Sequence, residues 1–112
     1  MSHTTTATVV LKNATTIRFN VIKESVDETT AMAKALMIES VKRQMRQGIA
    51  HFVYRKKNGE IREAFGTTNP AVVAKHTNGN GVTKEMYTNT AYFDIEKGGW
   101  RSFRWESIIK VF

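Results

Sequence analysis

The Asn58-Gly59 pair is the feature that most restricts how this chain can fold. It lies between residues 49–57 and 60–66, which are rich in β-branched and aromatic side chains, and such an arrangement is the strongest short-range signal of a β-hairpin. A two-residue loop predicts a register that pairs Lys57 with Glu60, Arg55 with Arg62, Val53 with Ala64 and Phe52 with Phe65. One face would then carry Phe52, Tyr54, Ile61 and Phe65, and the other His51, Arg55 and Arg62. Two arginines directly opposite each other repel, and an anionic partner or the nearby Glu60 and Glu63 would relieve this.

Residues 26–47 have the pattern of one long amphipathic helix. Ser25 and Glu28 have the spacing of a capping box, acidic residues begin the segment, basic residues end it, and Gly48 follows as a stop. The main apolar stripe repeats at helical spacing through Ala31, Ala35, Ile38, Val41 and Met45, with Met32 and Leu36 widening it. A stripe of this kind is typical of a core-facing helix rather than of a docking surface.

The remaining segments predict short strands. Residues 8–12 and 16–23 are rich in Val, Ile, Thr and Phe and predict an N-terminal hairpin. Residues 76–81 have the composition of a loop, and residues 82–88 predict an edge strand. Residues 90–96 and 100–105 predict a second hairpin, whose three-residue loop would pair Phe93 with Phe103 and Asp94 with Ser102. Phe93, Ile95 and Phe103 would then point inward, and Tyr92, Asp94, Ser102 and Arg104 outward. A last strand covers residues 108–112.

Length and composition predict one domain in a reducing compartment. The 112 residues suffice for a single compact domain, which we divide into a flexible tail at 1–7, a ββα element at 8–48 and a small barrel of antiparallel strands at 49–112. The absence of cysteine excludes disulfides, thiolate zinc sites and cysteine nucleophiles. No apolar run reaches the ~20 residues of a membrane span, and the first residues do not form a signal peptide. We therefore expect a cytoplasmic protein with no membrane partner.

The positive charge is concentrated in one part of the chain. The formal net charge is +7, and residues 42–62 hold seven Lys and Arg side chains against one acid, Glu60. Such a cluster is either a solvated surface that keeps the protein soluble or an anion-binding patch. The helix end and the hairpin should lie close together in space, which favours the patch.

The residue pattern offers little for catalysis. His3, His51 and His76 do not have the spacing of metal ligands, and we expect neither a metal nor a cofactor. Asp94 and Glu96 lie two residues apart and could form a paired-carboxylate site, but arginines on the neighbouring strand are the simpler partners for them. We therefore expect a protein that binds a partner and is not an enzyme.

Three segments of the last third are similar to a known family. They are 66–70 (Gly-Thr-Thr-Asn-Pro), 92–100 (Tyr-Phe-Asp-Ile-Glu-Lys-Gly-Gly-Trp) and 101–104 (Arg-Ser-Phe-Arg). They resemble small Sm-like, SH3-type β-barrel proteins related to the WYL domains and often found in phages and their bacterial hosts. The similarity covers about residues 46–112. The chain contains neither the Trp-Tyr-Leu tripeptide nor a helix-turn-helix, so a role in transcription regulation is not implied.

The resemblance implies a ligand- or single-strand-sensing role, with Arg101 and Arg104 as contact residues. Together with the residue pattern, it predicts an α+β fold in which an N-terminal β-hairpin and one long helix pack on a small antiparallel SH3/Sm-like β-barrel. Phosphates attract Lys and Arg, and unpaired bases stack on aromatic rings. We therefore expect single-stranded DNA or RNA to be bound by Arg55, Lys56, Lys57, Arg62, Tyr92, Trp100, Arg101 and Arg104. Trp105 is expected in the core.

A second class of function stays open at this point. A small basic phage protein without catalytic motifs can also act by binding a host protein, as an antirestriction or host-takeover inhibitor would. Such a host–virus interaction would place the chain in the host cytoplasm, and self-association into a homo-oligomer is compatible with either function.

Overall fold

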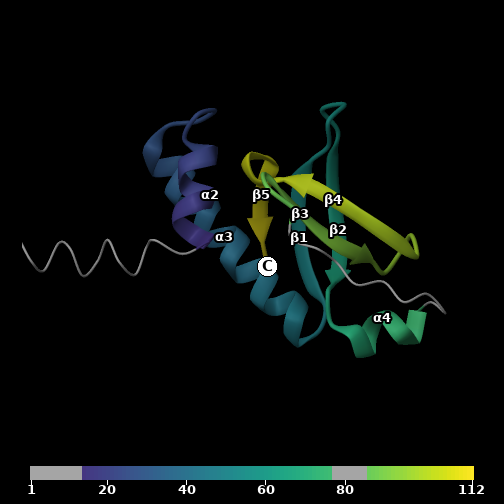
Figure 1. Cartoon of the computed structure of the whole chain (residues 1–112). Helices are drawn as coiled ribbons and strands as arrows, with labels where there is room; N and C mark the ends of the chain where they lie inside the picture. Colours follow the sequence, from purple (N-terminus) through teal and green to yellow (C-terminus); the bar gives the residue numbers. More distant parts are fainter. Residues whose placement is uncertain (1–13, 77–85) are drawn as a thin grey trace, which may run out of the picture.

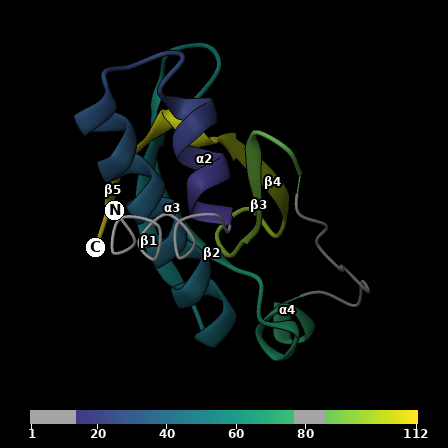
Figure 2. The same cartoon turned by 60° about the vertical axis from the view of Figure 1, so that its left-hand side comes forward.

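The computed structural model describes residues 14–76 and 86–112 and has an α+β architecture. Two helices, α2 (Ala14–Ile22) and α3 (Glu28–Gln47), pack together beside a five-stranded antiparallel sheet, as Figures 1 and 2 show. The strands are β1 (Ala50–Arg55), β2 (Ile61–Thr67), β3 (Asn89–Asp94), β4 (Gly99–Arg104) and β5 (Ile108–Val111). A short helix, α4 (Pro70–His76), follows β2. None of the described helices has the length and apolarity needed to cross a membrane.

The connection between β4 and β5 forces the sheet to curve. The strand order is β4-β3-β2-β1-β5, so β4 and β5 lie at opposite edges. Only the 3-10 helix η1 (Trp105–Ser107) joins these two strands along the chain. Three residues span at most about 10 Å, so the two edges must come close together. The sheet is therefore bent around its own interior, as a small barrel requires.

Helix α3 covers this interior with the apolar stripe predicted from the sequence. Ala31, Ala35, Ile38, Val41 and Met45 are fully buried and join Phe52, Tyr92 and Ile108 in one core cluster. Leu36 does not belong to this stripe, since it is 54% exposed. Gly48 follows the last helical residue, and its N–H donates to the carbonyl of Gln44.

The helix begins two residues later than predicted because a different residue caps it. Asp27, and not Ser25, is the N-cap: its carboxylate accepts hydrogen bonds from the Thr30 backbone N–H at 3.1 Å and from the Thr30 hydroxyl at 2.6 Å. These hydrogen bonds lower the pKa of Asp27 below 3.8. The carboxylate is therefore charged at neutral pH and complements the partial positive charge of the helix N-terminus.

We expect Asp27→Ala to lower the melting temperature at neutral pH, since the first turn then loses its acceptor. Ser25→Ala should leave the melting temperature unchanged. Because the folded state lowers the pKa of Asp27, its carboxylate stabilises the fold fully at pH values above the pKa of the unfolded chain. This stabilisation is lost as the pH falls through the lower pKa of the folded state. Thermal scans at pH 7 and near pH 2 should thus show the difference between the two variants shrinking in acid. Equal melting temperatures at pH 7 would contradict the Asp27 cap.

The predicted N-terminal hairpin is wrong where the structure describes it. Residues 14–22 form helix α2, while residues 1–13 lie outside the described part. Thr15, Arg18 and Ile22 are buried and lie on one face at helical spacing. Arg18 donates to Glu39 of α3 at 2.8 Å, and its guanidinium lies over the ring of Trp105. Packing against α3 thus outweighs the β-propensity of the Val, Ile, Thr and Phe side chains.

The Asn58-Gly59 hairpin is present, but its predicted register is wrong by one residue. Tyr54 pairs with Arg62 and Arg55 with Ile61. The Lys56 N–H donates to the Glu60 carbonyl at 2.7 Å, which leaves residues 57–59 as a three-residue loop with Gly59 at φ 90°. A slip of one residue moves side chains to the opposite face. Arg62 therefore shares the inner face with Tyr54, and no arginine pair forms across these two strands.

The second hairpin also has a longer loop than predicted. Asp94 pairs with Gly99 and Phe93 with Trp100, so residues 95–98 form a four-residue loop. One carboxylate oxygen of Asp94 accepts the backbone N–H groups of Glu96 at 3.0 Å and Lys97 at 2.9 Å. This side-chain turn sets the loop length. Tyr92 and Asp94, which were predicted to point outward, are buried. Phe103 is buried as predicted, and Ser102 and Arg104 are exposed as predicted. Of the predicted strand at 82–88, residues 82–85 lie outside the described part, and Met86 forms an isolated bridge with Asn89.

Gly66 marks the tightest approach between the strands and the core. A Cβ at this position would lie 2.5 Å from Tyr92 Cδ2 and 3.2 Å from Phe52 Cε1, and both rings are fully buried. We expect Gly66→Ala to lower the free energy of unfolding by about 1–3 kcal/mol through overpacking. Gly99→Ala is the matched control, since its Cβ would meet nothing within 4 Å. Urea denaturation measures both, and equal stabilities would contradict this packing.

Candidate nucleic-acid interface

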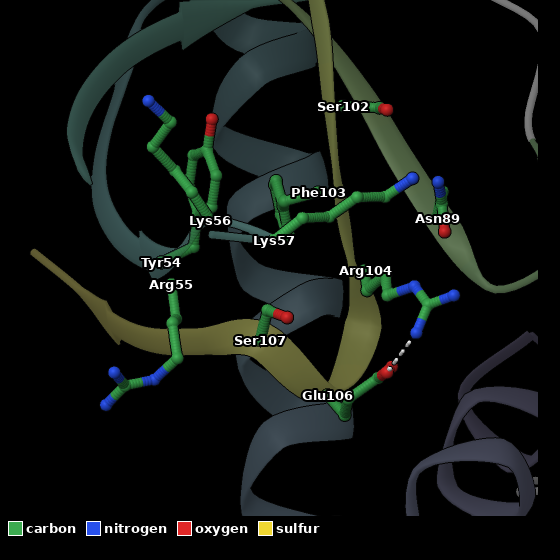
Figure 3. A pocket seen from close by; sticks show the side chains of 10 residues that line it. All are labelled: Tyr54, Arg55, Lys56, Lys57, Asn89, Ser102, Phe103, Arg104, Glu106 and Ser107. Atoms are coloured by element: carbon green, nitrogen blue, oxygen red, sulfur yellow. Dashed lines mark ion pairs between the residues drawn. The ribbon is translucent and has the colours of Figure 1, made fainter. Parts of the chain in front are cut away.

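Two adjoining cavities lie between the tip of the β1–β2 hairpin and strand β4. The larger has a volume of about 430 Å³ and the smaller about 330 Å³. They share the lining residues Tyr54, Lys56, Lys57 and Ser102, and we call the two together the basic groove. The larger cavity is also lined by Arg55, Asn89, Phe103, Arg104, Glu106 and Ser107, and the smaller by Trp100 and Arg101. Figure 3 shows the larger cavity, with Arg104 and Asn89 across from the hairpin residues.

The basic groove is strongly positive. Among residues 14–76 and 86–112, five cationic side chains line it against one carboxylate, and all five are exposed: Arg55, Lys56, Lys57, Arg101 and Arg104. The carboxylate belongs to Glu106, which lies 3.6 Å from Arg104. Lys56 lies 3.4 Å from Glu60, a contact between exposed groups that is weak and easily exchanged for another anion. The groove therefore suits an anionic ligand.

Trp100 is the exposed aromatic side chain of the groove. It is 37% exposed, and its ring stands nearly perpendicular to that of Phe93, with the ring centroids 5.7 Å apart and the planes at 78°. The exposed part of the indole is open to a ligand in the groove. Trp105, in contrast, is buried in the core as predicted, and its indole N–H donates to the Thr90 hydroxyl at 3.1 Å.

A cluster of buried polar side chains lies in the interior next to the groove and contacts its lining. Tyr54 forms part of the lining, and its hydroxyl lies 2.7 Å from the hydroxyl of the fully buried Tyr92. Burial, reinforced by the hydrogen bond to Tyr54, raises the pKa of Tyr92 far above its usual value of 10.0, so this phenol stays neutral. Tyr92 therefore positions Tyr54 and does not reach the surface, in contrast to the contact role predicted for it.

Arg62 belongs to the same buried cluster and not to the groove surface. Its guanidinium donates to the fully buried Asp94 at 2.5 Å, and its side chain is only 18% exposed. Burial alone would lower the pKa of Arg62, but the hydrogen bonds to Asp94 and Tyr92 and the attraction of the Asp94 charge together outweigh burial and raise this pKa above its usual value. Arg101 also approaches the same carboxylate oxygen, at 3.6 Å, so Asp94 helps to position one groove cation.

Sequence reasoning found the cations of the groove but missed its neutral lining. Asn89, Ser102 and Ser107 line the larger cavity, and only the observed register of the second hairpin brings Asn89 beside Arg104. Thr88, just before Asn89, has φ 75°, which is unusual for a β-branched residue, and its hydroxyl donates to the Asn89 side-chain oxygen at 3.1 Å. The side-chain oxygen of Asn89 thus accepts a hydrogen bond from its neighbour in the chain.

Within the described residues there is no group of three or more His, Cys, Asp or Glu side chains that could hold a metal ion.

Comparisons with known proteins agree with this architecture. No solved structure gives a significant match. A protein of Enterobacteria phage T4, named the uncharacterized 11.5 kDa protein in the Gp31-cd intergenic region, is 28% identical over 85 residues, which cover 73% of this chain and 83% of the phage protein. The model of the WYL_2 family, described as an Sm-like SH3 β-barrel fold, matches residues 38–109. This match spans the second half of α3, strands β1 to β4, the start of β5 and all the residues that line the groove. The chain belongs to the WYL_2 family of Sm-like SH3 β-barrel proteins.

Proposed function

We propose that this protein binds single-stranded nucleic acid in the basic groove and acts as a binding protein rather than as an enzyme. The observation that carries the proposal is that cations from two hairpins, distant in sequence, line one groove together with an exposed tryptophan. Phosphates are attracted by clustered Lys and Arg side chains, and unpaired bases stack on aromatic faces. A single strand offers both groups at once.

The shape of the surface favours a single strand over a duplex. The groove lies across strands and a hairpin, where small barrels bind extended strands with their bases unstacked. Reading a duplex would require an element that enters the major groove, usually an exposed helix. Helix α3 instead faces the sheet with its buried stripe and packs against α2.

The test is a fluorescence anisotropy titration of short labelled DNA and RNA strands at several salt concentrations. Contacts from Lys56, Lys57, Arg101 and Arg104 should give a log-log salt slope near −3, at ~0.7 per phosphate for single strands. A duplex of equal length should bind more weakly. Absence of binding at low salt would overturn the proposal. If one protein were then captured stoichiometrically from host lysate, inhibition of a host protein would replace it.

Trp100→Ala should weaken binding while leaving the salt slope unchanged. Losing one stacked base costs about 1–3 kcal/mol, which corresponds to a loss of affinity of roughly 5- to 150-fold. Stacking releases no counterions, so the slope reports only the phosphate contacts. Trp100→Tyr is the matched control, because it keeps an aromatic face. Equal affinities for Trp100→Ala and the wild type, in folded protein, would exclude stacking on this residue.

A further inference from the structure

A second positively charged cavity lies next to the basic groove. It has a volume of about 150 Å³ and is lined by Lys42 and Arg46 of α3, Thr68 and Ala91. The described residues of its lining offer an ammonium, a guanidinium and a hydroxyl group, and none of these residues carries a carboxylate. This combination of donors suits a phosphate group, which accepts charge-assisted hydrogen bonds from all three.

The end of α3 is held firmly in place at this cavity. The Thr68 N–H donates to the Met45 carbonyl at 3.2 Å, and the Asn69 side chain donates to the Arg46 carbonyl at 2.9 Å. The buried Thr67 hydroxyl lies 3.1 Å from the Met45 carbonyl and 2.6 Å from that of Gly48. Figure 1 shows this end of α3 beside the point where β2 passes into α4. The backbone that carries Arg46 is therefore rigid, and binding need not order it.

The second cavity and the basic groove meet across one pair of residues. Ala91 lines the second cavity, Ser102 lines both parts of the groove, and the two residues are direct partners between β3 and β4. Directly opposed residues of antiparallel strands lie about 5 Å apart and point to the same face of the sheet. Both side chains are small, so no bulky group stands between the two sites at this pair.

We infer that a single strand bound in the basic groove continues across the Ala91–Ser102 pair and places a phosphate in the cavity of Lys42, Arg46 and Thr68. This inference rests on the proposed function and extends it to the length of nucleic acid that the protein covers. A strand that fills only the groove would not reach α3. Affinity should therefore rise with strand length until the second cavity is occupied.

The test compares two arginines of the same helix. Arg46→Gln removes a cation from the second cavity, and Arg43→Gln removes another exposed cation of α3 that does not line it. Each variant is titrated with oligothymidines of about 4 and about 12 nucleotides, since small barrels cover ~4–16 nucleotides. Arg46→Gln should weaken binding of the long strand about threefold to tenfold and make its salt slope shallower by ~0.7, with little change for the short strand. Arg43→Gln should change both strands little.

A second variant tests the path itself. Ala91→Glu places a carboxylate between the two sites and should weaken the long strand more than the short one, with circular dichroism confirming that the variant folds. If Arg46→Gln and Arg43→Gln weakened the long strand equally, the effect would be one of net charge, and the inference would be overturned. It would also be overturned if the wild type bound both lengths equally well. No binding of either length at low salt would instead contradict the proposed function.

Discussion

Arg62→Ala is expected to destabilise the protein strongly, whereas Arg55→Ala is expected to have almost no effect on stability. Removing Arg62 leaves the carboxylate of Asp94 fully buried without its main partner. Breaking a buried ion pair in this way costs about 3–5 kcal/mol. We expect the lower end of this range, because Asp94 keeps two backbone N–H donors and the approach of Arg101. The measurement is the free energy of unfolding in urea.

Arg55 provides the matched control for this prediction. It lies on the neighbouring strand, is exposed, and donates to the Gly59 carbonyl at 3.1 Å. A surface substitution of this kind changes stability by at most about 0.5 kcal/mol. The double variant Arg62→Ala with Asp94→Asn should lose less stability than the sum of the two single variants, because the buried charge is then gone. If Arg62→Ala and Arg55→Ala were equally stable, Arg62 would not be paired with Asp94. The register predicted from the sequence, which places Arg62 opposite Arg55 on the outer face, would then be favoured.

Neutralising three cations of the groove should remove most of the affinity for single strands without unfolding the protein. Lys56→Gln, Lys57→Gln and Arg104→Gln change side chains that are exposed and contribute little to the core. We expect the triple variant to bind about 100-fold more weakly at low salt and its salt slope to fall from near −3 to near −1, because three of four phosphate contacts are lost. Anisotropy titrations with DNA and RNA strands measure both quantities.

The control for the groove variant carries the same change in net charge elsewhere. Lys23, Lys75 and Lys110 are exposed and do not line the groove, and their joint replacement by glutamine also removes three positive charges. A specific groove predicts that this control binds nearly as well as the wild type. If both triple variants lost affinity to the same degree, binding would reflect overall charge, and the groove would have no special role.

The local patterns of the sequence determined several parts of this protein correctly. The apolar stripe of α3 repeats at helical spacing, and burial confirms it from Ala31 to Met45. Asn58-Gly59 lies in a tight hairpin, and the family resemblance of the last third agrees with the match at residues 38–109. Lys56 and Lys57 directly precede Asn58-Gly59 in the sequence, so their exposure at the tip of the hairpin could be predicted. These features depend on residues close together along the chain.

Only the tertiary structure decided which side chains meet. The strand-like composition of residues 16–22 was overruled because α2 buries Thr15, Arg18 and Ile22 against its neighbours. The register of each hairpin depends on details of its turn. In the first hairpin this detail is the extra loop residue, Lys57, and in the second it is the hydrogen bonds of the Asp94 side chain. The alternation of hydrophobic residues along a strand reveals neither.

The registers in turn decide which polar groups are buried and which form the site. A one-residue slip moves every side chain of a strand to the other face of the sheet. The observed registers differ from the predicted ones by one residue in the first hairpin and by three in the second. They place Arg62 and Tyr92 in the interior with Asp94 and bring Asn89 and Ser102 to the groove. Charge and aromatic content along the chain could thus indicate a binding surface. The residues that actually line this surface were decided by backbone pairing between segments far apart in the sequence. The same pairing brings Arg62 and Asp94 together, and a buried charge is tolerated only when its partner lies beside it.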